Sequence, residues 1–146
     1  MTPYPEKSIL VERDLSAVAH AACIVRDFAQ SHLDELLAGD VELAVVETLT
    51  NAIKHGQVHN RDDNDILITL KLDGPDLVVD IFDHAPLVPP DSFDRIAADH
   101  LDMDPANLDS LTESGRGLAL ILLSMDEVTL HADDALFRLH MRKRIP

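Results

Sequence analysis

The sequence predicts an α+β fold, a two-layer sandwich in which helices cover one face of a mixed, mostly antiparallel sheet. Three observations lead to this prediction. Strand-like segments come in pairs separated by hairpin signals, helical periodicity occupies three separate stretches, and the two kinds of segment follow one another along the chain. The length of 146 residues suits one domain with its own hydrophobic core, expected to span residues 1–146.

The N-terminal part predicts a short strand followed by a helix. The strand is expected at residues 8–12. Asp14 is expected to cap a helix that runs to about Ser31, because a capping carboxylate accepts hydrogen bonds from the free amides of the first turn. Cys23 lies inside this helix, and as the single cysteine it excludes an internal disulfide and a cysteine-based zinc site. Apolar residues recur at helical spacing at Leu15, Val18, Ala22, Val25 and Phe28.

The next segment predicts a second helix and a hairpin. Asp40 is expected to cap this helix and Gly56 to end it. Two strands follow at residues 65–72 and 77–83, and Asp73-Gly74 between them is a strong hairpin signal. The helix carries a broad apolar surface made by Val41, Ala44, Val45, Leu49, Ala52 and Ile53.

The remaining chain predicts a long loop, a helix and a closing hairpin. Residues 84–114 contain four prolines and many acidic residues with little periodicity. A loop of this length in a compact domain is usually functional, and we expect a lid. A third helix is expected at residues 115–125. Two strands at residues 127–131 and 136–142, turning around Asp133-Asp134, complete the predicted sheet.

The charge excludes some classes of partner. Twelve basic and 27 acidic residues give a net charge of −15, which repels phosphate backbones and anionic lipid, so direct nucleic-acid or membrane binding is not expected. The charge suits a basic protein partner, and it is equally explained by solubility alone. No signal peptide is predicted, and the longest apolar segment, residues 118–123, is too short to cross a bilayer. We therefore expect a cytoplasmic protein.

Three features carry potential chemistry. Glu47, Asn51 and His55 recur every four residues and place a carboxylate, an amide and an imidazole on one helix face. Taken alone, this row is equally explained as a partly exposed polar stripe. Gly115 and Gly117 stand at the start of the third helix, where glycine allows backbone to approach a ligand and free amides attract anions; a flexible helix entry is the alternative. Asp83 ends an apolar strand, a common arrangement by itself.

In combination, these features resemble a known family. The segment from Glu47 to Gly56 resembles the N-box of the anti-sigma-factor serine kinases, which belong to the GHKL superfamily and have the Bergerat fold. Residues 83–86 stand where the family has its first glycine box, and residues 115–118 resemble the second. Met125-Asp126-Glu127-Val128 resembles the sequence that follows it. The resemblance extends from about residue 8 to residue 143.

The resemblance implies an ATP site and roles for particular residues. Asn51 is expected to hold Mg²⁺ between the ATP phosphates, and an amide oxygen suits this hard cation. Glu47 is expected to act as general base on the attacking serine hydroxyl. Asp83 is expected to bind the adenine amino group. The residues that the resemblance places around the nucleotide are Asn51, His55, Asp83, Ala85, Gly115, Arg116, Gly117 and Leu118.

The resemblance also implies partners and leaves two functions open. The first is a Mg²⁺-ATP-dependent serine kinase that phosphorylates an anti-sigma-factor antagonist, binds a sigma factor and forms a homodimer. The second is a partner-binding module of the same fold without turnover. Ala85 stands where the first box normally has glycine and Leu87 where longer versions have the second, which favours the module. The substitution Glu47→Gln separates the two, because it abolishes phosphotransfer only in a kinase.

Overall fold

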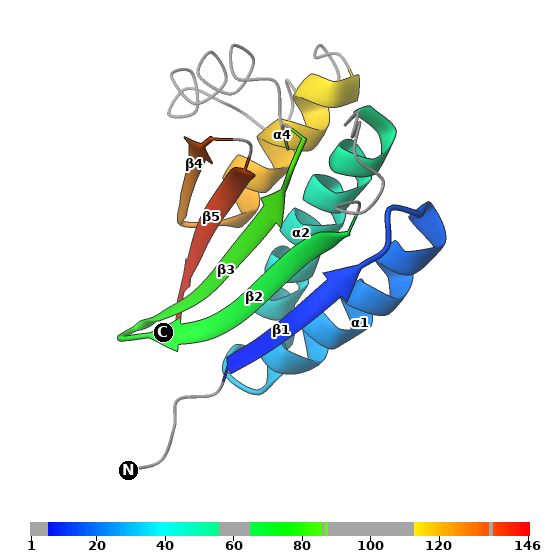
Figure 1. The fold of residues 1–146 in the computed structure, drawn as a ribbon. Helices are drawn as coiled ribbons and strands as arrows, with labels where there is room; N and C mark the ends of the chain where they lie inside the picture. The colour runs from blue at the N-terminus through cyan, green and yellow to red at the C-terminus, as the bar shows by residue number, and fades with distance from the viewer. Residues whose placement is uncertain (1–5, 56–64, 86, 88–112, 135) are drawn as a thin grey trace.

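The computed structural model describes residues 6–55, 65–85, 87, 113–134 and 136–146; the side chains of residue 55 and residues 113–116 are not part of this description. In that part of the chain, three helices and five strands form two layers (Figure 1). This confirms the predicted α+β sandwich. The elements are β1 (Glu6–Val11), α1 (Leu15–Gln30), α2 (Glu35–His55), β2 (Ile66–Asp73), β3 (Asp76–Asp83), α4 (Glu113–Ser124), β4 (Glu127–Asp133) and β5 (Leu136–Arg144).

The strands form one sheet in the order β1-β2-β3-β5-β4. Every pair of neighbouring strands in the described residues is antiparallel. The last strand therefore lies inside the sheet, between β3 and β4. Its register sets Phe137 opposite Asp83 and Arg144 opposite Asp76, so β5 covers the whole length of β3.

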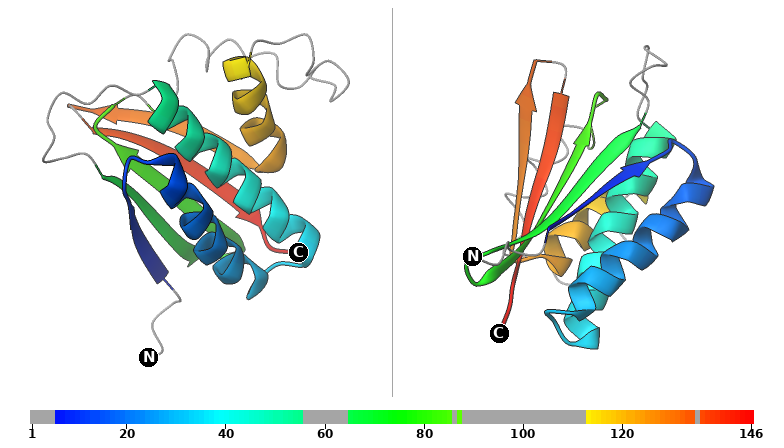
Figure 2. Two further views of the ribbon diagram at one scale, coloured as in Figure 1. Left: turned by 90° about the vertical axis from the view of Figure 1, so that its right-hand side faces the viewer. Right: turned by 60° about the horizontal axis from the view of Figure 1, so that its bottom comes forward.

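The three helices cover one face of this sheet, as the two views in Figure 2 show. Helix α2 lies in the middle and packs against both α1 and α4. Alternate side chains of the strands point into the space under the helices, because successive residues of a strand face opposite sides. The largest fully buried side chains of this core include Leu49 of α2, Ile66, Ile68 and Leu70 of β2, Leu77 and Ile81 of β3, and Leu139 and Met141 of β5.

The beginnings of the two long helices test the predicted caps. Asp14 caps α1, and its Oδ1 accepts a hydrogen bond from the backbone N–H of Ser16 at 3.0 Å. The predicted cap of the second helix is wrong. Asp34 takes this place, since its Oδ1 accepts from the N–H of Leu37 at 2.8 Å. Helix α2 already begins at Glu35, and Asp40 lies inside it.

The two hairpin turns lie where the sequence predicts them. Gly74 has φ 59° between β2 and β3, a left-handed conformation that glycine adopts without steric penalty. Asp134 has φ 53° between β4 and β5, where aspartate is among the few other residues that tolerate it. The third helix begins at Glu113, slightly earlier than predicted. Gly56 and residues 88–112, most of the predicted lid, lie outside the described residues.

Candidate functional site

The predicted site residues come from three elements that end together. Figure 1 shows the C-terminal ends of α2 and β3 and the N-terminal end of α4 at the same end of the sandwich. The predicted site residues extend from Glu47 to Leu118 along the chain, and the fold brings the elements that carry them to one place. Two contacts define the described part of this site.

The first contact lies between α2 and α4, at Gly117. A β-carbon built at Gly117 would stand 2.9 Å from Oε2 of Glu47 and 3.3 Å from Nδ2 of Asn51. The missing side chain therefore allows the backbone of α4 to pass directly over the half-buried carboxylate and amide of α2. Three residues that the sequence singled out in two separate motifs are thus immediate neighbours. Their chemical roles stay predictions.

The second contact holds Asp83, whose side chain is fully buried at the end of β3. Its Oδ1 accepts a hydrogen bond from Nη2 of Arg13 and forms an ion pair with that guanidinium. Nη1 of Arg13 also donates to the backbone carbonyl of Ala52 in α2 at 2.8 Å. Arg13 therefore joins the connection between β1 and α1 to both β3 and α2.

This ion pair leaves two polar atoms without a partner. Oδ2 of Asp83 and Nε of Arg13 are buried and have no hydrogen-bond partner among the residues that the structure describes. Such atoms are rare in folded proteins because losing water without a replacement hydrogen bond is unfavourable. Oδ2 is a hydrogen-bond acceptor, and a ligand with an N–H group at this end of β3 would satisfy it. The adenine amino group fits this requirement.

Sequence analysis missed Arg13. Local patterns gave no reason to select it, because it stands in the short connection between a strand and a helix. The one available signal was indirect: a carboxylate expected at the end of a buried strand needs a cation nearby, since an unpaired buried charge is costly. Which of the basic residues supplies the cation follows only from the sheet order and helix packing.

The remaining predicted residues divide into two groups. Ala85 and Leu118 are buried, with exposed fractions of 1% and 2%, and Leu118 belongs to the hydrophobic core. Because the side chain of Leu118 lies in the core, only its backbone is left to contact a ligand. His55 ends α2, and Gly115 and Arg116 lie in the first turn of α4. Nothing further is described of the side chains of these three residues.

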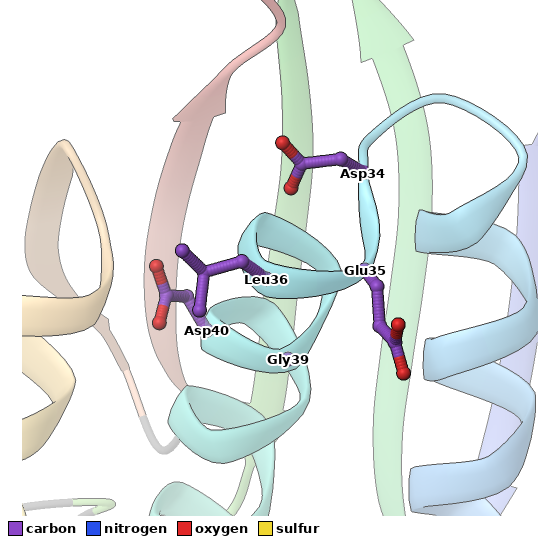
Figure 3. A pocket seen from close by; sticks show the side chains of 5 residues that line it. All are labelled: Asp34, Glu35, Leu36, Gly39 and Asp40. Carbon is purple, nitrogen blue, oxygen red and sulfur yellow. The ribbon is translucent and has the colours of Figure 1, made fainter.

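An open pocket at the other end of α2 is unrelated to these residues. It has a volume of about 530 Å³ and is lined by Asp34, Glu35, Leu36, Gly39 and Asp40. Figure 3 shows the three carboxylates pointing in different directions, so they do not converge on a common point. Among the described residues, no group of three or more histidine, cysteine, aspartate or glutamate side chains is arranged to hold a metal ion.

Comparison with one solved structure supports the fold. The RsbU and RsbW domains of Rv1364c from Mycobacterium tuberculosis match with a TM-score of 0.68 and 15% identity, over 98% of this chain and 33% of that one. This chain thus spans about a third of the length of the chain that it matches. A blue-light activated histidine kinase from Erythrobacter litoralis gives 0.49 and 14% identity, over 90% of this chain and 60% of that one. Histidine kinase AdeS from Acinetobacter baumannii gives 0.47 and 14%, over 95% and 68%.

Comparison with sequence families is more specific. No curated protein matches the chain. None of the helices that the structure describes combines the length and apolar composition needed to cross a membrane. Residues 11–143 match the family described as the histidine kinase-like ATPase domain, and this match includes all the site residues discussed above. The chain belongs to the family of histidine kinase-like ATPase domains.

Proposed function

We propose that the protein is a Mg²⁺-ATP-dependent protein-serine kinase of the anti-sigma-factor type. The observation that carries this proposal is the contact at Gly117, where the backbone of α4 meets both Glu47 and Asn51. Phosphoryl transfer needs a general base, a metal ligand and backbone amides that face the phosphates. The carboxylate of Glu47, the amide of Asn51 and the backbone at the start of α4 are groups of these three kinds.

Asn51 and Glu47 of α2 have different roles in this proposal. The amide oxygen of Asn51 is a suitable ligand for Mg²⁺, which when bound neutralises charge on the ATP phosphates. Glu47 precedes Asn51 by about one helical turn, so their Cα atoms are separated by about 6 Å along the helix axis. At this spacing the carboxylate can accept the proton of a serine hydroxyl that approaches beside the phosphates. The free amides in the first turn of α4 attract the phosphate oxygens.

Asp83 is assigned to bind the adenine ring of the nucleotide. Its buried Oδ2 is an acceptor that requires a donor, and the adenine amino group supplies one. In this proposal the substrate is a small anti-sigma-factor antagonist, and a sigma factor is the second partner. We also propose a cytoplasmic homodimer of one domain per chain.

A partner-binding module without turnover is the second candidate, and it rests on Ala85 and Leu87. Both side chains are buried, each with an exposed fraction of 1%, in the segment that resembles the first glycine box. Side chains thus occupy positions where glycines would leave room. This candidate predicts weak or absent ATP binding with partner binding intact.

Calorimetric titration with ATP and Mg²⁺ tests the kinase proposal. Saturable binding that Asn51→Ala and Asp83→Asn both weaken, together with phosphorylation of an antagonist-type protein from the same genome, is the expected result. Glu47→Gln should retain ATP binding and lose phosphotransfer. Glu42→Gln, the same change on α2 at a residue that pairs with Arg26, serves as the control and should retain both. Absence of binding at millimolar ATP would favour the module.

A further inference from the structure

We propose that Arg13 is a positioning residue that makes the site selective for a purine with a 6-amino group over one with a 6-oxo group. This inference rests on the proposed nucleotide site, and concerns which base the site accepts. Arg13 acts through Asp83: it holds the carboxylate by one oxygen and leaves the other for the base.

The contacts of Arg13 hold its guanidinium between Asp83 of β3 and Ala52 of α2. Its Nη2 donates to Oδ1 of Asp83, and its Nη1 donates to the carbonyl of Ala52 at 2.8 Å. The Arg13 side chain is 10% exposed and that of Asp83 is 0% exposed. A guanidinium is planar and rigid, so the bond of Nη1 to Ala52 fixes the direction from which Nη2 reaches the carboxylate more strictly than a lysine ammonium would.

The ion pair also decides which oxygen of Asp83 is left for the base. Oδ1 is occupied by Arg13, and Oδ2 has no partner among the described residues. A carboxylate oxygen only accepts hydrogen bonds. Oδ2 then attracts a 6-amino group and repels the oxygen of a 6-oxo group.

The bond to Ala52 links this selectivity to the phosphate end of the site. Ala52 directly follows Asn51 in α2, so the same guanidinium connects the carboxylate of β3 to the helix that carries the proposed metal ligand. The distance between the base end and the phosphate end therefore depends on Arg13. Its loss should affect the choice of base more than the attraction of the phosphates, because Asn51 and α4 stay in place.

Competition binding with ATP and ITP tests this inference, since ITP has an oxygen in place of the 6-amino group and a hydrogen on N1 in place of a lone pair. The wild-type protein should prefer ATP by at least about tenfold, because a site built to bind the 6-amino N–H group rejects an analogue that presents an oxygen at that position. In Arg13→Met the preference should fall to less than about threefold, and in Arg13→Lys, which retains the charge, it should stay above that of Arg13→Met. Arg26→Met is the matched control, because Arg26 pairs with Glu35 and Glu42 on the surface, and its preference should equal that of the wild type.

Folding is followed by circular dichroism and thermal unfolding for each variant. If Arg13→Met alone fails to fold, Arg13→Met combined with Asp83→Asn removes both buried charges and should bind ATP and ITP with nearly equal affinity. Equal weakening of both nucleotides with an unchanged ratio would show that Arg13 only supports the fold, which overturns this inference and leaves the nucleotide site standing. A wild-type protein that binds neither nucleotide would overturn both.

Discussion

Gly117 lies against Glu47 so closely that a β-carbon at position 117 would stand 2.9 Å from the Glu47 carboxylate oxygen Oε2. The near atom is the end of a flexible side chain, so a methyl group here would displace the carboxylate and leave the backbone in place. The effect of such a change therefore separates function from stability.

Gly117→Ala should keep the fold and lose activity. Alanine favours a helix over glycine by about 1 kcal/mol, which offsets the crowding and leaves the free energy of unfolding near that of the wild type. Displacement of Glu47 should reduce phosphotransfer by about 10- to 100-fold, because catalytic groups tolerate little misplacement. Urea unfolding and a phosphotransfer assay measure the two effects.

Gly39→Ala is the control for this experiment. Gly39 also lies inside a helix, α2, but a β-carbon there would meet no atom within 4 Å. The substitution should raise the free energy of unfolding by about 0.5–1 kcal/mol and leave phosphotransfer unchanged. A Gly117→Ala variant that behaves like Gly39→Ala in both assays would contradict the role given to the helix crossing.

The ion pair of Arg13 and Asp83 should show strong coupling in stability. Arg13→Met leaves a buried carboxylate without its partner and should lower the free energy of unfolding by about 3 kcal/mol. In an Asp83→Asn background the same change should have a smaller effect, by about 1–3 kcal/mol. Denaturant unfolding of the four proteins completes the cycle. Additive effects would mean that the two side chains do not stabilise each other.

Lys143 should stabilise the junction of α4, α2 and β5. Its side chain is 9% exposed, and its ammonium donates to the carbonyl of Ser124 at 2.6 Å and to Asp40 at 3.2 Å. Lys143→Met should lower the free energy of unfolding by about 2 kcal/mol, because the last carbonyls of α4 lose a charged donor. Arg144→Met, a change of the same type at an exposed neighbour, should stay within about 0.5 kcal/mol of the wild type. Chemical unfolding compares the two, and equal effects would count against this role of Lys143.

Lys143 and Arg13 also show where prediction from sequence stopped. Periodicity, caps and turn residues are local signals, and they located all the described helices and strands. At Asp40 a local signal was misread, because Asp34 caps the helix six residues earlier, and the carboxylate of Asp40 instead bonds Lys143, more than 100 residues further along the chain. Arg13 and Asp83 are likewise 70 residues apart. Contacts of this kind depend on which strands are neighbours, and no short-range pattern contains that information.

Within the candidate site, the sequence likewise predicts single residues but not the contacts between them. The motifs identified Glu47, Asn51, Asp83 and Gly117 because each stands at a helix or strand position that resembles a family motif. That Gly117 touches both α2 residues follows from the packing of α4 against α2. That Oδ2 of Asp83 is buried without a partner among the described residues follows only from the fold.

Arg142 should make stability depend on pH through Asp73. The hydrogen bond and charge of Arg142 lower the pKa of Asp73 below its ordinary value of 3.8, and the hydrogen bonds to Asp73 and Asp76 raise the pKa of Arg142. A lowered carboxyl pKa means that the interaction stabilises the fold above about pH 4 and is lost as the pH falls through the lowered value. Arg142→Met should therefore reduce stability more at about pH 7 than at about pH 2.

Unfolding midpoints measured over this pH range check the prediction. Arg144→Met serves again as the control, and its effect should not change with pH in this way. Because Asp73 is exposed at the sheet surface, added salt should weaken the effect of Arg142 at neutral pH. An Arg142→Met difference that is the same at both ends of the range would contradict the assignment to Asp73.

The inner position of β5 has a consequence for the newly synthesised chain. Strand β3 pairs with β5 over its full length, yet β5 begins about 50 residues after β3 ends. A ribosome needs roughly 3–10 s to add this many residues. During that interval β3 has a free edge, and Leu77, Val79 and Ile81 lack the cover of β5. An unpaired apolar strand is prone to aggregate, so the nascent protein depends on rapid completion or on a chaperone until its last strand is inserted.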